Sequence, residues 1–293
     1  MKKMAYLKTI GLLYIVIVLL ASSVAILFCR IFRVNFLIAL AIILVLAVPV
    51  SIIGFQILMT KQKKNPYGKL HAEFVEELYK NGYSERFFEI SEKAVSAHKN
   101  GEKVNSVYLK DFVLYTADYY NATEQYAKAL SYIMLLNEND FTGKDTRFID
   151  YGMSALMYYG CLMETYRGLN DKEKAIKMIE RAKPILDRTF KSDVLSMGAD
   201  TVYYNYYMLL ENYERAEEFA DKILSYKSPE AERYFTKYYI EAEFNMHLGK
   251  KQEAVDSIKK MEPFLEGETK ILFSFYYSNF IKRLGLQEEI AQK

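Results

Sequence analysis

The side chains most able to do chemistry in this chain are its three histidines, and they are widely separated. His71, His98 and His247 have no cysteine or carboxylate at metal-ligand spacing beyond what any charged helix supplies. Adjacent carboxylates such as Glu76 and Glu77 project from different parts of a helical surface, so they are typical of a solvated face. The sequence contains no phosphate-binding glycine loop, serine-nucleophile motif or zinc-protease motif. We therefore expect no catalytic residue, metal ligand or cofactor, and we do not expect an enzyme.

Charge is distributed unevenly along the 293 residues. Residues 1–67 hold eight of the 39 lysines and arginines and no acidic residue, so this segment carries +8. The other 31 basic residues are outnumbered by 37 acidic ones, so residues 68–293 carry −6. Because binding to a phosphate backbone requires a basic surface, nucleic acid is not an expected partner.

The basic segment contains two long apolar runs. Residues 9–29 and 34–60 comprise 21 and 27 uncharged, mostly apolar residues, and a helix needs about 20 to cross a bilayer. Only the four residues from Arg30 to Arg33 separate them. Residues 1–60 therefore predict a two-helix transmembrane hairpin, and its small residues would also allow association with other membrane proteins. The alternative, a buried hairpin of a soluble protein, is disfavoured because such charge-free runs are rare in soluble cores.

The charges that flank these runs predict their orientation. Lysines precede the first run and follow the second, whereas two arginines occupy the turn. The positive-inside rule therefore favours an integral protein of the cell membrane with the N-terminus and the body in the cytoplasm. In an alternative interpretation, signal peptidase cuts at residues 23–25 and removes the first run, which still leaves the body in the cytoplasm. Residues 61–68 are then a basic juxtamembrane linker to a cytosolic domain over residues 69–293.

The clearest pattern in the body is a pair of amphipathic helices over residues 158–186. Apolar residues of the first helix recur at spacings of three and four, at Tyr159, Leu162 and Tyr166. Residues 167–170 break this pattern. One face of the second helix carries small and apolar residues, at Ala175, Ile179 and Ala182. Asp171 is a suitable N-cap for the second helix.

This pair resembles the tetratricopeptide repeat (TPR), whose first helix carries an aromatic residue, a leucine and a tyrosine, and whose second carries alternating small and large apolar residues. It departs at Met163, where the family has a small residue, and at Tyr159, which replaces the usual tryptophan. Weaker copies have turn residues at Gly82, Glu211, Gly249 and Gly285. One further weak copy aligns best on Ala122 and Ala129, with Tyr126 as an alternative anchor. We expect an all-α chain with a TPR-like α-solenoid of about five hairpins plus a terminal helix over residues 270–284.

The resemblance implies a concave face, built from the first helices, that binds a protein or peptide partner. The side chains expected on this face are Asp111, Tyr115, Glu164, Arg167, Asn205, Tyr239, Glu243 and His247. Asn205 stands where some family members bind the backbone of a ligand peptide. Basic residues that grip a terminal carboxylate in chaperone-binding members are absent, Thr201 occupying one such position. The expected function is therefore a membrane-anchored scaffold or adaptor, and the alternative is a receptor or sensor for a short peptide or small ligand.

Overall fold

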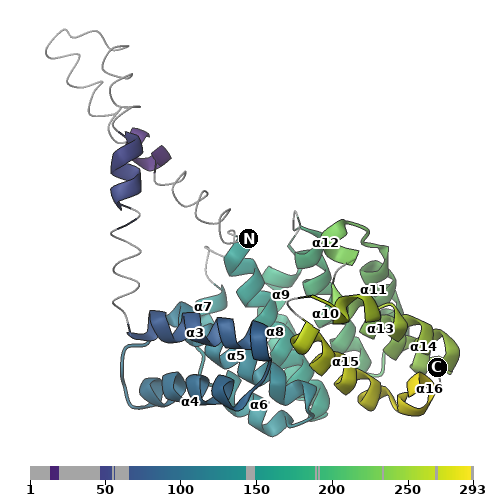
Figure 1. The fold of residues 1–293 in the computed structure, drawn as a ribbon. Coiled ribbons are helices and arrows are strands. Elements are labelled where there is room, and N and C mark those ends of the chain that lie inside the picture. Colours follow the sequence, from purple (N-terminus) through teal and green to yellow (C-terminus); the bar gives the residue numbers. More distant parts are fainter. Residues whose placement is uncertain are drawn as a thin grey trace, which may run out of the picture. The chain divides into compact units, whose positions relative to one another are not determined.

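The computed structural model describes residues 14–19, 47–54, 56, 66–142, 149–188, 190, 192–232, 234–267 and 270–291. The chain divides into two units, Met1–Lys69 and Leu70–Lys293. Every regular element in the described ranges is a helix, which confirms the all-α prediction for them (Figure 1).

In the first unit, the described parts of the two predicted spans are helical, at residues 14–19, 47–54 and 56. The rest of the spans, 9–29 and 34–60, lies outside the described residues, as does most of the predicted linker. Within the described residues, no helix has both the length and the apolar character needed to cross a membrane. The linker is shorter than predicted, because helix α3 (Pro66–Asn81) already begins at Pro66, a residue that suits the first position of a helix.

The second unit is a series of helix pairs, each joined by a short turn (Figure 1). The pairs are α3 with α4 (Glu85–Lys99), α5 (Ser106–Ala122) with α6 (Tyr126–Ile133), α8 (Ile149–Gly168) with α9 (Lys172–Leu186), α10 (Asp193–Leu209) with α11 (Tyr213–Ser225), α13 (Phe235–His247) with α14 (Lys251–Lys259), and α15 (Lys270–Leu284) with α16 (Gln287–Ala291). Short elements between pairs are α7 (Asn139–Thr142), α12 (Pro229–Glu232) and the 3₁₀-helix η2 (Glu262–Leu265). This arrangement is consistent with an α-solenoid, and the predicted terminal helix α15 is itself the first helix of a pair.

The turn within each pair passes through one residue in the left-handed backbone region. These residues are Gly82, Glu124, Asn170, Glu211, Gly249 and Gly285. A left-handed residue after a helix lets the chain reverse direction, and glycine adopts this conformation without a steric cost. The four predicted turn residues are therefore confirmed. Glu124 and Glu211 adopt this left-handed conformation although they carry a side chain, which lowers stability by roughly 1 kcal/mol at each position.

The predicted alignment of the second pair is wrong. Ala122 ends α5, and the turn follows at Glu124. Ala129 is fully buried in α6 and occupies the position that Ala175 has in α9, five residues after the turn. Tyr126, the alternative anchor, is only the first residue of α6. The seven-residue spacing of Ala122 and Ala129 matches that of Ala175 and Ala182, so the spacing favoured the wrong alignment.

The core confirms the predicted faces of the clearest pair. Tyr159, Leu162 and Tyr166 of α8 are buried, and so are Ala175 and Ala182 of α9. Asp171 caps α9, because its side chain accepts a hydrogen bond from the backbone N–H of Lys174. The helix α8 extends two residues into the predicted break, 167–170, and ends at Gly168.

Helix α15 links the two ends of the second unit. It packs against α13 and also against α5, a helix far from it in sequence (Figure 1). The hydroxyl of Tyr276 on α15 lies 2.5 Å from that of Tyr83 and donates a hydrogen bond to Asp118 of α5. Arg283, the penultimate residue of α15, donates to Glu164 of α8 at 2.8 Å. The last pair therefore closes the face that the first helices would otherwise leave open.

Candidate functional site

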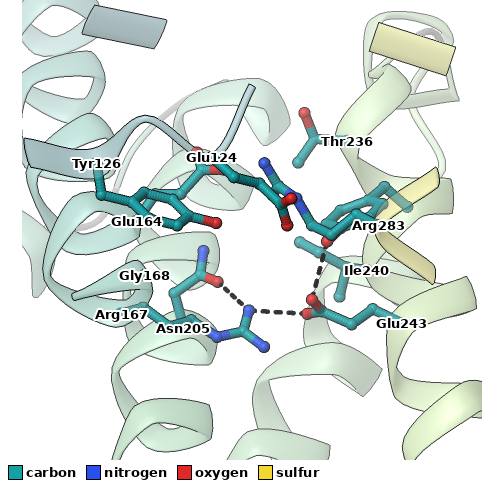
Figure 2. Close-up of a pocket in the computed structure, with 11 residues that line it drawn as sticks. Glu124, Tyr126, Glu164, Arg167, Gly168, Asn205, Thr236, Ile240, Glu243 and Arg283 are labelled. Atoms are coloured by element: carbon teal, nitrogen blue, oxygen red, sulfur yellow. Dashed lines mark hydrogen bonds and ion pairs between the residues drawn. The ribbon is translucent and has the colours of Figure 1, made fainter. Parts of the chain in front are cut away.

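A cavity of about 250 Å³ lies where α8, α10, α13 and α15 meet the turn between α5 and α6 (Figure 2). Five of the residues predicted for the concave face line it, namely Glu164, Arg167, Asn205, Tyr239 and Glu243. A second cavity of about 330 Å³ shares Glu164, Thr236 and Tyr239 with the first. The two cavities are therefore adjacent, and Glu164, Thr236 and Tyr239 form the wall between them.

The other three predicted residues line neither cavity. Asp111 pairs with His71, whose Nε2 lies 2.6 Å from the Asp111 carboxylate. The ring of Tyr115 packs beside Phe74 with centroids 6.1 Å apart. His247 lies at the end of α13 and packs on Tyr213 with centroids 3.8 Å apart. These residues lie on first helices as predicted, but their side chains contact other neighbours and line neither cavity.

An ion pair between Arg167 and Glu243 forms the floor of the first cavity (Figure 2). Arg167 Nη1 donates to Glu243 Oε2 at 2.9 Å. The hydroxyls of Tyr204 and Tyr239 also donate to this carboxylate, at 3.0 and 2.9 Å. The side chains of Arg167 and Glu243 are 25% and 13% exposed, so the pair is largely removed from water and its hydrogen bonds hold it in one geometry.

The surroundings of this pair favour its charged form. Burial alone would raise the pKa of Glu243, but the Arg167 charge and three hydrogen bonds hold that pKa below its usual value. Burial and the neighbouring Glu243 carboxylate raise the pKa of Tyr204 and of Tyr239 well above the usual value. Both phenols therefore stay neutral and remain donors to the carboxylate at any physiological pH.

Asn205 is already engaged on both sides of its amide. Its Oδ1 accepts from Arg167 Nη1 at 2.7 Å, and its Nδ2 donates to the backbone oxygen of Thr201 at 3.1 Å. A primary amide carries two N–H groups, so one N–H is left without a partner among the described residues. The predicted contact of Asn205 with a ligand backbone is thus limited to this single donor.

Arg283 of α15 supplies a second cation that the sequence did not indicate. Its side chain is 16% exposed and its guanidinium lies 5.8 Å from the centre of the Tyr239 ring. Nη1 donates to Glu164 and Nη2 to the backbone oxygen of Asn121, both at 2.8 Å. Its Nε is buried and has no partner among the described residues. Nothing in the local sequence could have placed Arg283 here, because its position depends on the closure of the whole array.

Tyr126 lies against the end of α8, where its ring covers Gly168. A Cβ on Gly168 would overlap three ring atoms of Tyr126. The absence of a side chain at Gly168 therefore allows the Tyr126 ring to sit beside Glu164 at the cavity (Figure 2). The sequence presented Gly168 as part of a helix break and Tyr126 as a weak repeat anchor, so neither was expected in the site.

Neither a metal centre nor a known relative identifies the site. Among the described residues, no group of three or more histidines, cysteines or carboxylates is placed to hold a metal ion. No protein-family model, curated protein or solved structure matches the chain. The cavity offers fixed charges, neutral phenols and a few free hydrogen-bond donors, which are groups suited to holding a polar ligand in one orientation.

Proposed function

We propose that the protein is a membrane-anchored scaffold or adaptor whose TPR-like repeat unit binds a short peptide segment of a partner protein in the cavity around Arg167. One observation carries the proposal, namely that five residues expected on a ligand-binding face converge on a single cavity. Preformed cavities with a few fixed polar groups are the usual form of ligand sites in proteins. Residues 1–60 would anchor the unit on the cytoplasmic side of the membrane.

The size of the site restricts the ligand to a short extended segment. The two adjacent cavities measure about 250 and 330 Å³, whereas a helix with its side chains is about 10–12 Å wide. Because α15 packs against α5 and α13 and bonds to α8, the two cavities, as the described residues line them, leave no room for a partner helix. A few residues of extended chain are the largest ligand that fits without movement of α15.

This closure also favours a second candidate function, a receptor or sensor for a free short peptide or small ligand. The cavity wall contains Arg283, a residue of α15 that bonds to α8 through Glu164 and to α5 through Asn121. A ligand in the cavity would therefore touch the element that closes the array. A change in that contact is what a sensor would transmit to the membrane segment.

Selection from a library of random heptapeptides tests the proposal. The full-length chain in detergent is immobilised, and retained peptides are sequenced by mass spectrometry. A variant with Thr236→Trp fills the wall shared by both cavities and should lose the retained set, whereas Ser131→Trp on the exposed face of α6 should keep it. Equal retention by both variants would place binding elsewhere and overturn the proposal.

The same peptides distinguish the two candidates. A scaffold should also bind the selected sequence when both of its ends are joined to a folded carrier protein. A sensor for free peptides should bind only peptides with a free end. Melting curves of both variants show whether the Trp substitutions leave the fold intact.

A further inference from the structure

The two cavities hold more negative than positive charge. Among the described residues that line them, the carboxylates are Asp118, Glu124, Glu164 and Glu243, and the cations are Arg167 and Arg283. Glu243 is matched by Arg167, and Glu164 by Arg283. Asp118 receives hydrogen bonds from the hydroxyls of Tyr83 and Tyr276 rather than from a cation. A positively charged ligand would therefore compensate the negative charge that the described walls leave unpaired.

Glu124 is the carboxylate most available to such a ligand. It is exposed at the mouth of the first cavity and has no side-chain hydrogen bond or ion pair with any described residue. It also occupies a left-handed turn position, with φ of 59°, which a glycine would fill without steric cost. A charged side chain is thus held at the cavity mouth in a conformation that disfavours side chains.

The molecule itself shows what a glutamate at this turn position binds. Glu211 has the same φ of 59° in the turn between α10 and α11. Its carboxylate accepts from the Nζ of Lys172 at 2.6 Å. Glu124 is the equivalent residue in the turn between α5 and α6, and the structure describes no lysine beside it. A lysine or arginine of a ligand would take the place that Lys172 has at Glu211.

The remaining walls suit the rest of a basic residue in a peptide. The ring of Tyr126, fixed over Gly168, stands beside the carboxylates and offers an aromatic surface for a cation (Figure 2). The unmatched N–H of Asn205 is a donor that a peptide carbonyl would satisfy. A residue with a cationic side chain and backbone carbonyls meets all of these groups.

We infer that the cavity around Arg167 selects a lysine or arginine side chain, which Glu124 holds beside the ring of Tyr126. The inference rests on the proposed function, since it names the residue that the bound segment must contain. An acidic repeat unit, at −6 over residues 68–293, would further favour the approach of a basic segment.

Calorimetric titration of blocked pentapeptides into the full-length chain in detergent tests this selectivity. The peptides are acetylated and amidated, and they carry lysine, arginine, norleucine or glutamate between four alanines. We expect lysine and arginine to bind at least tenfold more tightly than norleucine, and glutamate to bind most weakly. Norleucine has the length of lysine without its charge, so equal binding of lysine and norleucine overturns the inference while the proposed peptide site stands. Binding of none of the four overturns both.

Two matched variants locate the selectivity. Glu124→Gly removes the carboxylate and relieves the left-handed side chain, so it should reduce the preference for lysine to less than threefold without lowering the melting temperature. Glu211→Gly makes the same change at the equivalent turn outside the cavity and should leave the preference intact. Equal losses in the two variants would show that the acidic surface attracts basic peptides in general, and the inference would then be wrong.

Discussion

At the scale of single residues, the ion pair between Arg167 and Glu243 is the feature on which the cavity depends most. Glu243 accepts three hydrogen bonds, from Arg167, Tyr204 and Tyr239, which come from three different helices. A buried ion pair stabilises a fold little when compared with apolar residues, but removal of one partner leaves an uncompensated charge. The pair therefore fixes the geometry of the cavity more than it adds to stability.

The first prediction concerns this pair. Arg167→Met should lower the free energy of unfolding by about 3 kcal/mol, because it leaves the Glu243 carboxylate buried with only two phenols. The double variant Arg167→Met/Glu243→Leu should recover most of that loss. Urea denaturation of the four proteins of this cycle measures the coupling. Lys177→Ala breaks an exposed pair with Glu173 and serves as control, with an expected change below about 0.5 kcal/mol. A double variant as unstable as Arg167→Met would contradict the argument.

The second prediction concerns pH. Burial, and next the negative charge of Glu164, raise the pKa of Asp118 to about 6, although hydrogen bonds from Tyr276 and Tyr83 and the charge of Arg283 oppose the shift. Because the unfolded chain has a lower pKa, close to 3.9, the folded protein gains stability from this proton below about pH 4 and loses the gain as pH rises through 6. The Asp118→Asn variant has no carboxyl group to titrate at this position, so its stability does not fall for this reason as pH rises.

Between pH 4.5 and 7.5 the stability of the Asn variant relative to the natural protein should therefore rise by about 1 kcal/mol, a value reduced for partial exposure of the side chain. Urea denaturation at both pH values measures this difference. A difference that stays constant between the two pH values would show that Asp118 titrates as an ordinary exposed carboxylate.

At the scale of helices, two glycines of α8 have opposite roles. A Cβ on Gly160 meets no atom within 4 Å, whereas a Cβ on Gly168 would overlap the Tyr126 ring. Gly160→Ala should therefore stabilise the protein by about 0.5–1 kcal/mol, because alanine has the higher helix propensity. Gly168→Ala should destabilise it by about 1–3 kcal/mol, because Tyr126 must move. Thermal melting measures both effects, and the same sign in both variants would mean that Tyr126 is not held by Gly168.

The helix pairs could be predicted where one face of a helix carries a strong periodic pattern. Turn residues such as Gly82 and Gly249 followed from glycine after an apolar stripe, and the α8–α9 pair followed from its spacing. The α5–α6 pair did not, because the seven-residue spacing of Ala122 and Ala129 matches that of Ala175 and Ala182 and so favoured an alignment seven residues too early. The glutamate in its turn is not the cause, since the turn at Glu211 was predicted although it also holds a glutamate.

At the scale of the whole molecule, the cavity depends on contacts between residues more than a hundred positions apart. Arg283 reaches Glu164, and Tyr276 reaches Asp118. Small rotations between successive helix pairs accumulate along the array and bring α15 against α5. The position of α15 therefore depends on the whole array and cannot be predicted from any short stretch of sequence. Five predicted residues reach the cavity because they share a face of their helices. Glu124, Tyr126 and Arg283 were missed because the closure of the array places them there.

The last prediction is the topology of the chain in a membrane. The basic head and the lysines that flank its two apolar runs favour cytoplasmic ends and a turn on the outer side. In a Cys29→Ser background, Ile31→Cys should be labelled by a membrane-impermeant maleimide in intact cells, and Lys250→Cys, at an exposed turn of the repeat unit, only after lysis. Cys161 should not interfere, since it is buried and burial raises its thiol pKa well above the usual value, which keeps it unreactive. Labelling at position 250 in intact cells would place the cavity outside the cytoplasm, where a cytosolic partner could not reach it.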